Sequence, residues 1–218
     1  MNELANVDQS YTTEVVRKAI HLSSLSIPIV YYFVSRETAL SILIPLALAF
    51  GLSDIARLLH PPTGRLYERY IGFLLRRHER NDRGRHLNGA TYVLLSATLC
   101  VFLFPKVIVI TAFAIMIVSD TSAALIGRKF GKHPFMGKSF EGTAAFFVSA
   151  LAVVAVAPKV SYLPTEYLIG VGAALLGALV EAFPAIIDDN LSIPVSIGAA
   201  MWLMYSVFLP AISLNSPG

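Results

Sequence analysis

The stretch from Val107 to Lys132 reads VIVITAFAIMIVSDTSAALIGRKFGK, and it determines the class of the whole chain. Up to Ile126 it is apolar apart from small hydroxyl residues and one acid, Asp120, and about 20 such residues are enough to cross a bilayer. An ionised carboxylate inside a membrane span is costly unless it faces a partner, an ion or a water-filled cavity. We therefore expect a membrane-spanning helix in which Asp120 serves function; a structural pair with an arginine is the alternative.

The rest of the chain shares this apolar character. Of its 218 residues, 56% are hydrophobic and only 14% are charged, whereas soluble domains carry about 25% charged residues. We expect one all-α, polytopic membrane bundle over residues 1–218, with about seven transmembrane helices, in contact with membrane lipids and not with nucleic acid. The expected spans are residues 19–34, 38–59, 88–104, 107–126, 142–157, 166–183 and 192–209.

Basic residues are divided unevenly between alternate connections. If the N-terminus is cytoplasmic, the inner connections hold 14 of the Lys and Arg residues and the outer ones hold 3. The positive-inside rule then predicts a cytoplasmic N-terminus and an external C-terminus, in the cytoplasmic membrane if the source is bacterial. The expected cytoplasmic segments are residues 1–18, 60–87, 127–141 and 184–191.

The second of these segments has a pattern of its own. Leu66, Tyr70, Phe73 and Leu74 recur at helical spacing, and arginines fill most of the positions between them. An aromatic apolar side opposite an arginine-rich side is typical of an interfacial helix on an anionic leaflet. We expect one interfacial amphipathic helix within residues 60–87; a soluble helical loop is the alternative.

A glycine-rich basic segment follows Asp120. Gly127 and Gly131 permit a close backbone approach, and the surrounding cations are Arg128, Lys129, Lys132 and Lys138. Ser139 is expected to cap the next helix, which would leave backbone N–H groups beside Lys138 as an anion site. An ordinary basic loop would explain the cations but not the glycines or the acid.

The start of the first span and the start of the third carry further candidates. Arg17 and His21 are four residues apart and share a helix face, with Lys18 beside them; a topology anchor also explains the two cations. Asn88 and Thr91 are hydrogen-bond donors one turn apart, and capping explains them equally well.

Two adjacent acids mark the last expected cytoplasmic segment. Asp188 and Asp189 offer the oxygen ligands that Mg²⁺ prefers, although a solvated helix cap would need the same residues. Carboxylates for a metal, with cations and helix N-termini for phosphates, suit phosphoryl or nucleotidyl transfer.

These motifs, taken in order, resemble the family of CTP-dependent lipid kinases that includes dolichol kinase, phytol kinase and CTP-dependent diacylglycerol kinase. The resemblance extends from Arg17 to Pro194. Its motifs are Arg17-Lys18-x-x-His21, Asn88-Gly89-Ala90-Thr91-Tyr92, Ser119-Asp120-Thr121 with Gly127-Arg128 and Gly131, Lys138-Ser139-x-Glu141-Gly142-Thr143, and Asp188-Asp189-Asn190-Leu191-x-Ile193-Pro194.

The resemblance implies transfer of the γ-phosphate of CTP to a membrane lipid alcohol, which could be a polyprenol or dolichol, phytol or diacylglycerol. The expected cofactor is Mg²⁺, held by Asp120 with Asp188 or Asp189, and the active site is expected at the cytoplasmic face. The expected catalytic residues are Asp120, Arg128, Lys138 and Glu141. The expected nucleotide-binding residues are Arg17, Lys18, His21, Asn88, Thr91, Gly127, Gly131, Lys132, Ser139, Gly142 and Thr143.

Two other functions stay open at this point. CDP-diacylglycerol synthase, a phosphatidate cytidylyltransferase, is a more distant resemblance: it shares the Ser-Asp, Gly-Arg and Lys-Ser-x-Glu-Gly features but ends in a longer signature that this chain lacks. A lipid-binding protein or transporter without catalysis is the third, and a transporter would be expected to show internal repeats. The sequence determines neither the lipid alcohol nor an oligomeric state.

Overall fold

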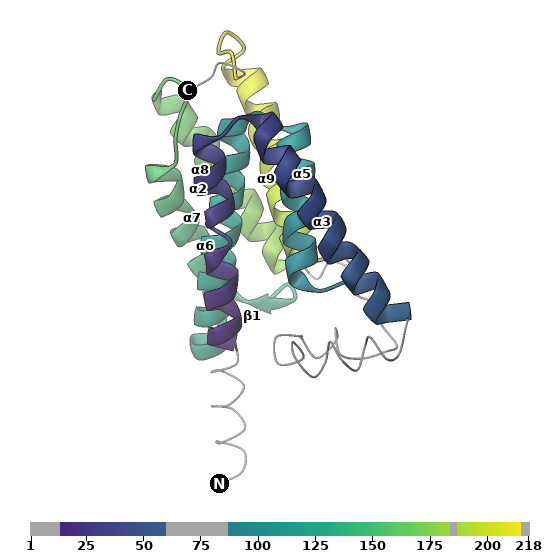
Figure 1. Cartoon of the computed structure of the whole chain (residues 1–218). Coiled ribbons are helices and arrows are strands. Elements are labelled where there is room, and N and C mark those ends of the chain that lie inside the picture. The colour runs from purple at the N-terminus through teal and green to yellow at the C-terminus, as the bar shows by residue number, and fades with distance from the viewer. Residues whose placement is uncertain (1–13, 60–86, 184–186, 215–218) are drawn as a thin grey trace.

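The computed structural model describes residues 14–59, 87–183 and 187–214, and it is a bundle of α-helices (Figure 1). Residues 14–23 are helical and lead into α2. The labelled helices are α2 (Ser26–Phe33), α3 (Arg36–Leu59), α5 (Gly89–Leu103), α6 (Lys106–Phe130), α7 (Phe140–Val156), α8 (Pro164–Ala182) and α9 (Asp189–Phe208). A short antiparallel hairpin of β1 (Pro134–Phe135) and β2 (Lys138–Ser139) connects α6 to α7.

The chain is an all-α integral membrane protein. Among the described residues, four helices are long and apolar enough to cross a bilayer, namely α3, α6, α8 and α9, while α5 and α7 are shorter apolar helices. Large apolar side chains such as Phe33, Val156 and Leu168 are exposed on the outside of the bundle, where a membrane protein contacts lipid. The interfacial helix expected within residues 60–87 lies outside the described residues, except for Leu87.

The helix boundaries follow the apolar runs with three informative differences. The first expected span is interrupted at residues 24–25, because Pro28 has no N–H to donate and Ser24 O accepts from Ile27 N in a tighter turn instead. In addition, α6 continues through Phe130, so part of the expected loop 127–141 is helical, and α9 begins at Asp189, inside the expected loop 184–191.

The core is built around α6. Phe113, Ile115, Met116 and Ile117 of this helix are fully buried, and α6 packs against α2, α7 and α9. In contrast, α3 is the least buried of the four long apolar helices. It packs along α5 and leans away from the rest of the bundle towards its own C-terminal end (Figure 1).

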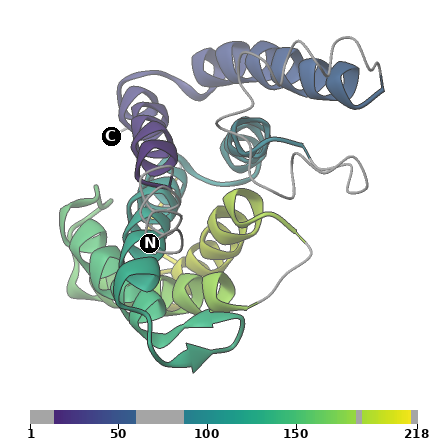
Figure 2. The same cartoon turned by 90° about the horizontal axis from the view of Figure 1, so that it is seen from below.

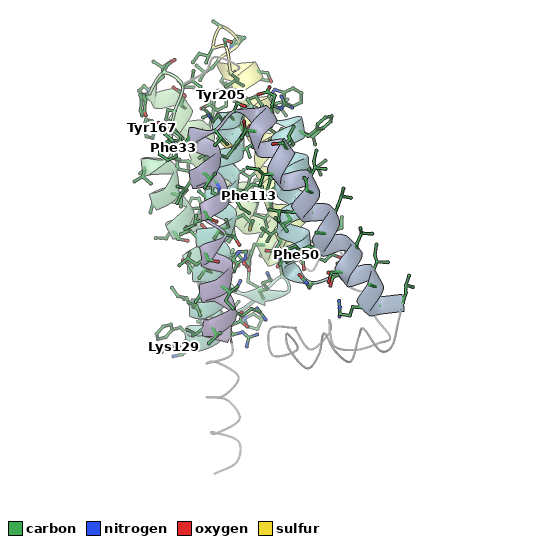
Figure 3. All side chains as sticks on the ribbon, viewed as in Figure 1. Phe33, Phe50, Phe113, Lys129, Tyr167 and Tyr205 are labelled. Carbon is green, nitrogen blue, oxygen red and sulfur yellow. The ribbon has the colours of Figure 1, made fainter. Side chains whose placement is uncertain are left out.

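The path of the chain gathers specific helix ends together. The C-terminal ends of α6 and α8, the hairpin, and the N-terminal ends of α7 and α9 lie at the lower end of the bundle in Figure 1, which we call the site end. Figure 3 shows Lys129 at this end and Tyr167 and Tyr205 near the opposite end. At that opposite end Glu166 is fully buried, and it accepts hydrogen bonds from three backbone N–H groups and from Tyr205 Oη at 3.0 Å.

Candidate functional site

Asp120 lies just past the middle of α6, on the side that faces the helix of residues 14–23. Lys18 Nζ donates to Asp120 Oδ2 at 2.5 Å, and His21 Nε2 lies 3.5 Å from the same oxygen. Lys18 and Asp120 are both buried, so each charge is largely removed from water. The partner of the membrane-embedded acid is therefore a lysine from a distant segment.

The hairpin positions Lys138 at the end of α8. Its two-residue turn has Met136 at a φ of 51° followed by Gly137, whose N–H donates to Ala182 O at 3.0 Å. Lys138 Nζ then reaches Glu181 Oε1 at 2.7 Å and Asp189 Oδ2 at 2.9 Å. One cation thus joins the last turn of α8 to the first residue of α9.

These two groups form one array of charges. Burial lowers the pKa of the Lys138 ammonium, but the carboxylates of Asp189 and Glu181 outweigh this effect and raise its pKa above the ordinary value. Asp120 interacts electrostatically with Lys138, and it acts on Glu181 and Asp189 in turn. The charge cluster, as we call it, consists of Lys18, His21, Asp120, Lys138, Glu181 and Asp189.

A second buried carboxylate fixes the start of α5. Asp54, fully buried near the end of α3, accepts from Asn88 N at 2.7 Å, from Thr91 Oγ1 at 2.7 Å and from Arg57 Nε at 3.3 Å. Asn88 in turn caps α5, because its side chain accepts from Thr91 N at 3.0 Å. The hydroxyl of Thr91 and the backbone N–H of Asn88 therefore join α5 to α3, while the side-chain oxygen of Asn88 is engaged in capping α5.

The start of α5, which Asp54 holds, lies against the start of α9. A Cβ placed on Gly89 would lie 3.5 Å from the side-chain nitrogen of Asn190, a buried residue. The Asn190 amide also donates to Asp188 Oδ1 at 2.8 Å, and the Asp188 carboxylate caps α9 through Asn190 N. Asp188 is thus the helix cap, whereas Asp189 is the acid that faces Lys138.

The glycines of the basic segment pack α6 against α7. A Cβ on Gly127 would lie 3.0 Å from Ser139 Oγ, and one on Gly142 would lie 3.1 Å from the same atom. A Cβ on Gly131 would run into the Gly127 carbonyl oxygen and lie 2.8 Å from Ser139 Oγ. Ser139 caps α7 by accepting from Gly142 N at 3.2 Å, and its own carbonyl accepts from Thr143 Oγ1. Close helix packing therefore requires these glycines.

The remaining candidates lie around this packed corner. Arg128 Nη2 contacts Glu14 Oε2 at 3.0 Å, and Glu14 also pairs with Arg17. Lys132 is exposed. Glu141 is turned towards the hairpin, where its Oε1 lies 2.7 Å from His133 Nδ1. The structure thus brings Arg17 and Arg128 to one carboxylate and keeps Glu141 with His133.

The oxygen donors of the charge cluster fit a cation that arrives with a nucleotide. Within residues 14–59, 87–183 and 187–214, no three His, Cys, Asp or Glu side chains are grouped to hold a metal by themselves. Mg²⁺ bound to a triphosphate needs only one or two carboxylates from the protein. Glu181 Oε2 is buried and has no hydrogen-bond partner among the described residues, so it is an oxygen available for such a ligand.

Three acids of this region were not among the residues expected from the sequence: Glu14, Asp54 and Glu181. Asp54 and Glu181 carry the same signal as Asp120, an acid near the end of an apolar run. Glu14 has no such signal, because it precedes the first apolar run and its partner Arg128 is far along the chain.

Comparison with known proteins finds relatives over most of the chain. The chain is 32% identical over 191 residues to an uncharacterized protein of Rickettsia prowazekii, and the match covers 86% of this chain and 93% of that protein. No family model matches the sequence, and no solved structure matches it.

Two similar relatives are named CTP-dependent diacylglycerol kinase 1. The protein from Schizosaccharomyces pombe is 28% identical over 166 residues, which cover 69% of this chain and 74% of the relative. The protein from Saccharomyces cerevisiae is 28% identical over 208 residues, which cover 84% of this chain and 70% of the relative.

Proposed function

This chain belongs to the protein family of its Rickettsia relative, a family related to the CTP-dependent lipid kinases, and from that premise we propose that it is such a kinase. The reaction moves the γ-phosphate of CTP to the hydroxyl of a membrane lipid and releases CDP and a lipid phosphate. The names of the two yeast relatives favour diacylglycerol as the acceptor. A polyprenol or dolichol and phytol are the other acceptors within the same proposal.

The observation that carries this proposal is the charge cluster at the site end of a membrane bundle. Three carboxylates and two lysines from separate segments meet there, and the carboxylate of Glu181 keeps one buried oxygen without a partner among the described residues. Such an array is costly to maintain in an apolar protein. Binding of a polyanionic nucleotide and its cation accounts for the presence of this array.

In this proposal the protein acts mainly by positioning and charge stabilisation, as phosphoryl transfer requires. Lys18 holds Asp120 in one orientation, and Lys138 holds Glu181 and Asp189. When phosphates bind, the lysines can neutralise phosphate oxygens while the carboxylates face the cation. The attacking lipid oxygen forms the new bond to the γ-phosphorus as the bond to the β,γ-bridging oxygen breaks, and the proton of the lipid hydroxyl is released.

Mg²⁺ is the expected cation, and it would neutralise charge on the triphosphate. Asp120 and Asp189 are the residues proposed to hold it, with Glu181 as a further oxygen donor. We choose Asp189 over Asp188 because Asp188 is occupied as the cap of α9, whereas Asp189 lies in the charge cluster.

Arg128, Lys132 and Arg17 are proposed to bind the outer side of the nucleotide. Arg128 and Arg17 converge on the carboxylate of Glu14, which shows that both side chains can reach one anionic group. A guanidinium suits phosphate oxygens because its planar fork can donate two hydrogen bonds. Asn88, Thr91 and the glycines contribute by fixing helix ends around the site.

The proposed orientation puts the site end in the cytoplasm, where CTP is available. The 14 to 3 division of basic residues supports it. Seven passages through the membrane follow if α5, α7 and the interrupted first helix cross together with the four long apolar helices.

The position of the transferred label tests the function. Purified protein would be incubated with lipid acceptors and with CTP labelled at either the γ- or the α-phosphate. A kinase transfers only the γ-label to lipid. Transfer of the α-label would identify a cytidylyltransferase instead, and transfer of neither label to any acceptor would identify a protein that binds or moves lipid without catalysis.

A further inference from the structure

One face of α8 carries a stripe of exposed apolar side chains. Leu168, Leu175 and Leu179 are spaced by seven and four residues, so they share a helix face. Phe183 continues this stripe just past the helix end, because its N–H still bonds to Leu179 O, and its side chain is 59% exposed. Since α8 is apolar and long enough to cross the bilayer, this face is the one that lipid tails contact.

The turn of the hairpin is attached at the end of this stripe. Gly137 N donates to the carbonyl of Ala182, the last residue of α8. The turn therefore lies at the depth where α8 leaves the apolar part of the membrane. Seen from below in Figure 2, the hairpin runs along the outer edge of the bundle, on the side away from α3.

Met136 is the first of the two residues of the turn. It adopts a φ of 51°, which is uncommon for a residue other than glycine, and its side chain is 59% exposed. A flexible, unbranched thioether side chain adapts well to an irregular apolar environment. In water it would add to the exposed apolar surface already formed by Phe183.

The backbone of the hairpin is suited to an environment with little water. Pro134 pairs with Ser139 and Phe135 with Lys138 in the two-stranded ladder, and Phe140 N donates to His133 O. Together with the bond from Gly137 to Ala182, these contacts satisfy much of the backbone of the turn. Backbone groups without such partners would be costly near the hydrocarbon region.

We propose that the turn at Met136 and Gly137 inserts into the interfacial layer of the host bilayer and anchors the hairpin there. The lipid-facing stripe of α8 is continuous with Phe183 and the turn, which is why the bilayer, and not a second copy or a soluble protein, is the partner. Lys138 follows the turn directly, so this anchor also fixes the depth at which its ammonium meets Glu181 and Asp189.

Fluorescence quenching of a tryptophan placed in the turn tests the proposal without any assay of catalysis. The chain has one tryptophan, Trp202, so Trp202→Phe gives a background into which Met136→Trp is introduced. Two matched controls use the same background: Leu179→Trp on the lipid-facing stripe, and Lys132→Trp in the exposed segment before the hairpin. Each variant is reconstituted in bilayers with and without lipids brominated near the headgroup.

The expected result is that bromolipids quench Met136→Trp, with a loss of emission closer to that of Leu179→Trp than to that of Lys132→Trp. Aqueous iodide should quench it less than it quenches Lys132→Trp. A Met136→Trp variant that responds to iodide as Lys132→Trp does, and shows no loss with bromolipids, overturns the proposal. Unchanged circular dichroism and elution volume establish that each variant is folded.

Discussion

Lys18 and Asp120 are 102 positions apart in the chain, yet Lys18 Nζ donates to Asp120 Oδ2 at 2.5 Å between two largely buried side chains. This contact fastens the N-terminal helical segment to the central helix α6. It also gives the membrane-embedded acid a partner of opposite charge. The structural role of this ion pair therefore coincides with the catalytic role that we propose for Asp120.

The first prediction separates these roles. Asp120→Asn should lose most turnover, because a neutral amide is a poorer ligand for a hard cation. Lys18→Met should lower the thermal stability, since removing one partner of a buried pair costs about 3–5 kcal/mol. The double variant Lys18→Met/Asp120→Asn should recover much of the stability but none of the turnover.

Melting temperature in a fixed detergent and the rate of γ-phosphate transfer are the two measurements. Near-normal turnover of Asp120→Asn at saturating Mg²⁺ would remove Asp120 from the site. Loss of both properties in the double variant, with no recovery of stability, would mean that the pair does more for the fold than the burial of opposite charges explains.

The second prediction concerns pH and Lys138. The Glu181 and Asp189 carboxylates raise its folded pKa above the ordinary value of about 10.4. A raised pKa stabilises the fold below the unfolded pKa, and that contribution is lost as pH rises through the folded pKa. The stability gap between wild type and Lys138→Gln should therefore be constant near neutral pH and close in the alkaline range.

Melting temperatures from about pH 7 to about pH 11 would test this. The side chain of Lys138 is 37% exposed, so screening by solvent keeps the gap small. Lys138→Arg is the control, because a guanidinium stays charged and its gap to Lys138→Gln should not close. If the difference in melting temperature between wild type and Lys138→Gln is independent of pH, the Lys138 ammonium does not stabilise the contact of the hairpin with α8 and α9.

The apolar runs of the sequence were sufficient to place most helices, and hydropathy explains why. A helix such as α8, expected at residues 166–183, is observed at Pro164–Ala182, because its length is determined by the membrane. The break at residues 24–25 depends on the missing N–H of Pro28 and was not expected. The hairpin was also missed, since strands of two residues carry no periodicity to detect.

Residue type pointed to the candidate site, but the partners of its charged residues could not be derived from spacing. Asp120 and the two lysines stood out as charges in or beside apolar segments, whereas their pairing depends on how helices pack over long separations. The sequence predicts Asp188 as a site residue and not Glu181, whereas the fold gives Glu181 the contact with Lys138 and makes Asp188 a cap.

The third prediction concerns Gly131, one of the glycines that pack α6 against α7. Gly131→Ala should destabilise the protein, because its Cβ would run into the Gly127 carbonyl oxygen and crowd Ser139. Gly51→Ala in α3 is the matched control, since no atom lies within 4 Å of a Cβ there, and alanine favours a helix by up to about 1 kcal/mol. The melting temperature of Gly131→Ala should fall, and that of Gly51→Ala should rise or stay unchanged. Equal melting temperatures would argue against close packing at this corner.

The fourth prediction concerns orientation. Cys100 is buried and is the single cysteine, so Cys100→Ala provides a background for labelling. Tyr162→Cys, at an exposed position of the opposite end, should react with an impermeant maleimide added to intact cells. Lys132→Cys should react only after the membrane is permeabilised. The reverse labelling pattern would show the opposite membrane orientation and would place the proposed site outside the cell.

The last prediction concerns the cations proposed to bind the triphosphate. Arg128→Ala should lower turnover and catalytic efficiency together, because a contact used only in the transition state is lost from both. A charge-assisted hydrogen bond contributes about 1.5–3 kcal/mol, so a loss of roughly ten- to hundredfold is expected. Lys132→Ala should mainly raise the Michaelis constant for CTP. Lys129→Ala should change little, because its ammonium lies over the ring of Phe130.

Steady-state kinetics with varied CTP would distinguish these outcomes, and the Glu14→Gln variant adds a structural control. Glu14 holds both Arg128 and Arg17, and its neutral form leaves the two guanidinium groups in place with a weaker partner. If Glu14 competes with the nucleotide for Arg128, Glu14→Gln should lower the Michaelis constant for CTP, and this gain should vanish when Arg128→Ala is added. Small and equal effects in every variant, with CTP affinity unchanged, would mean that these cations serve only as topology anchors.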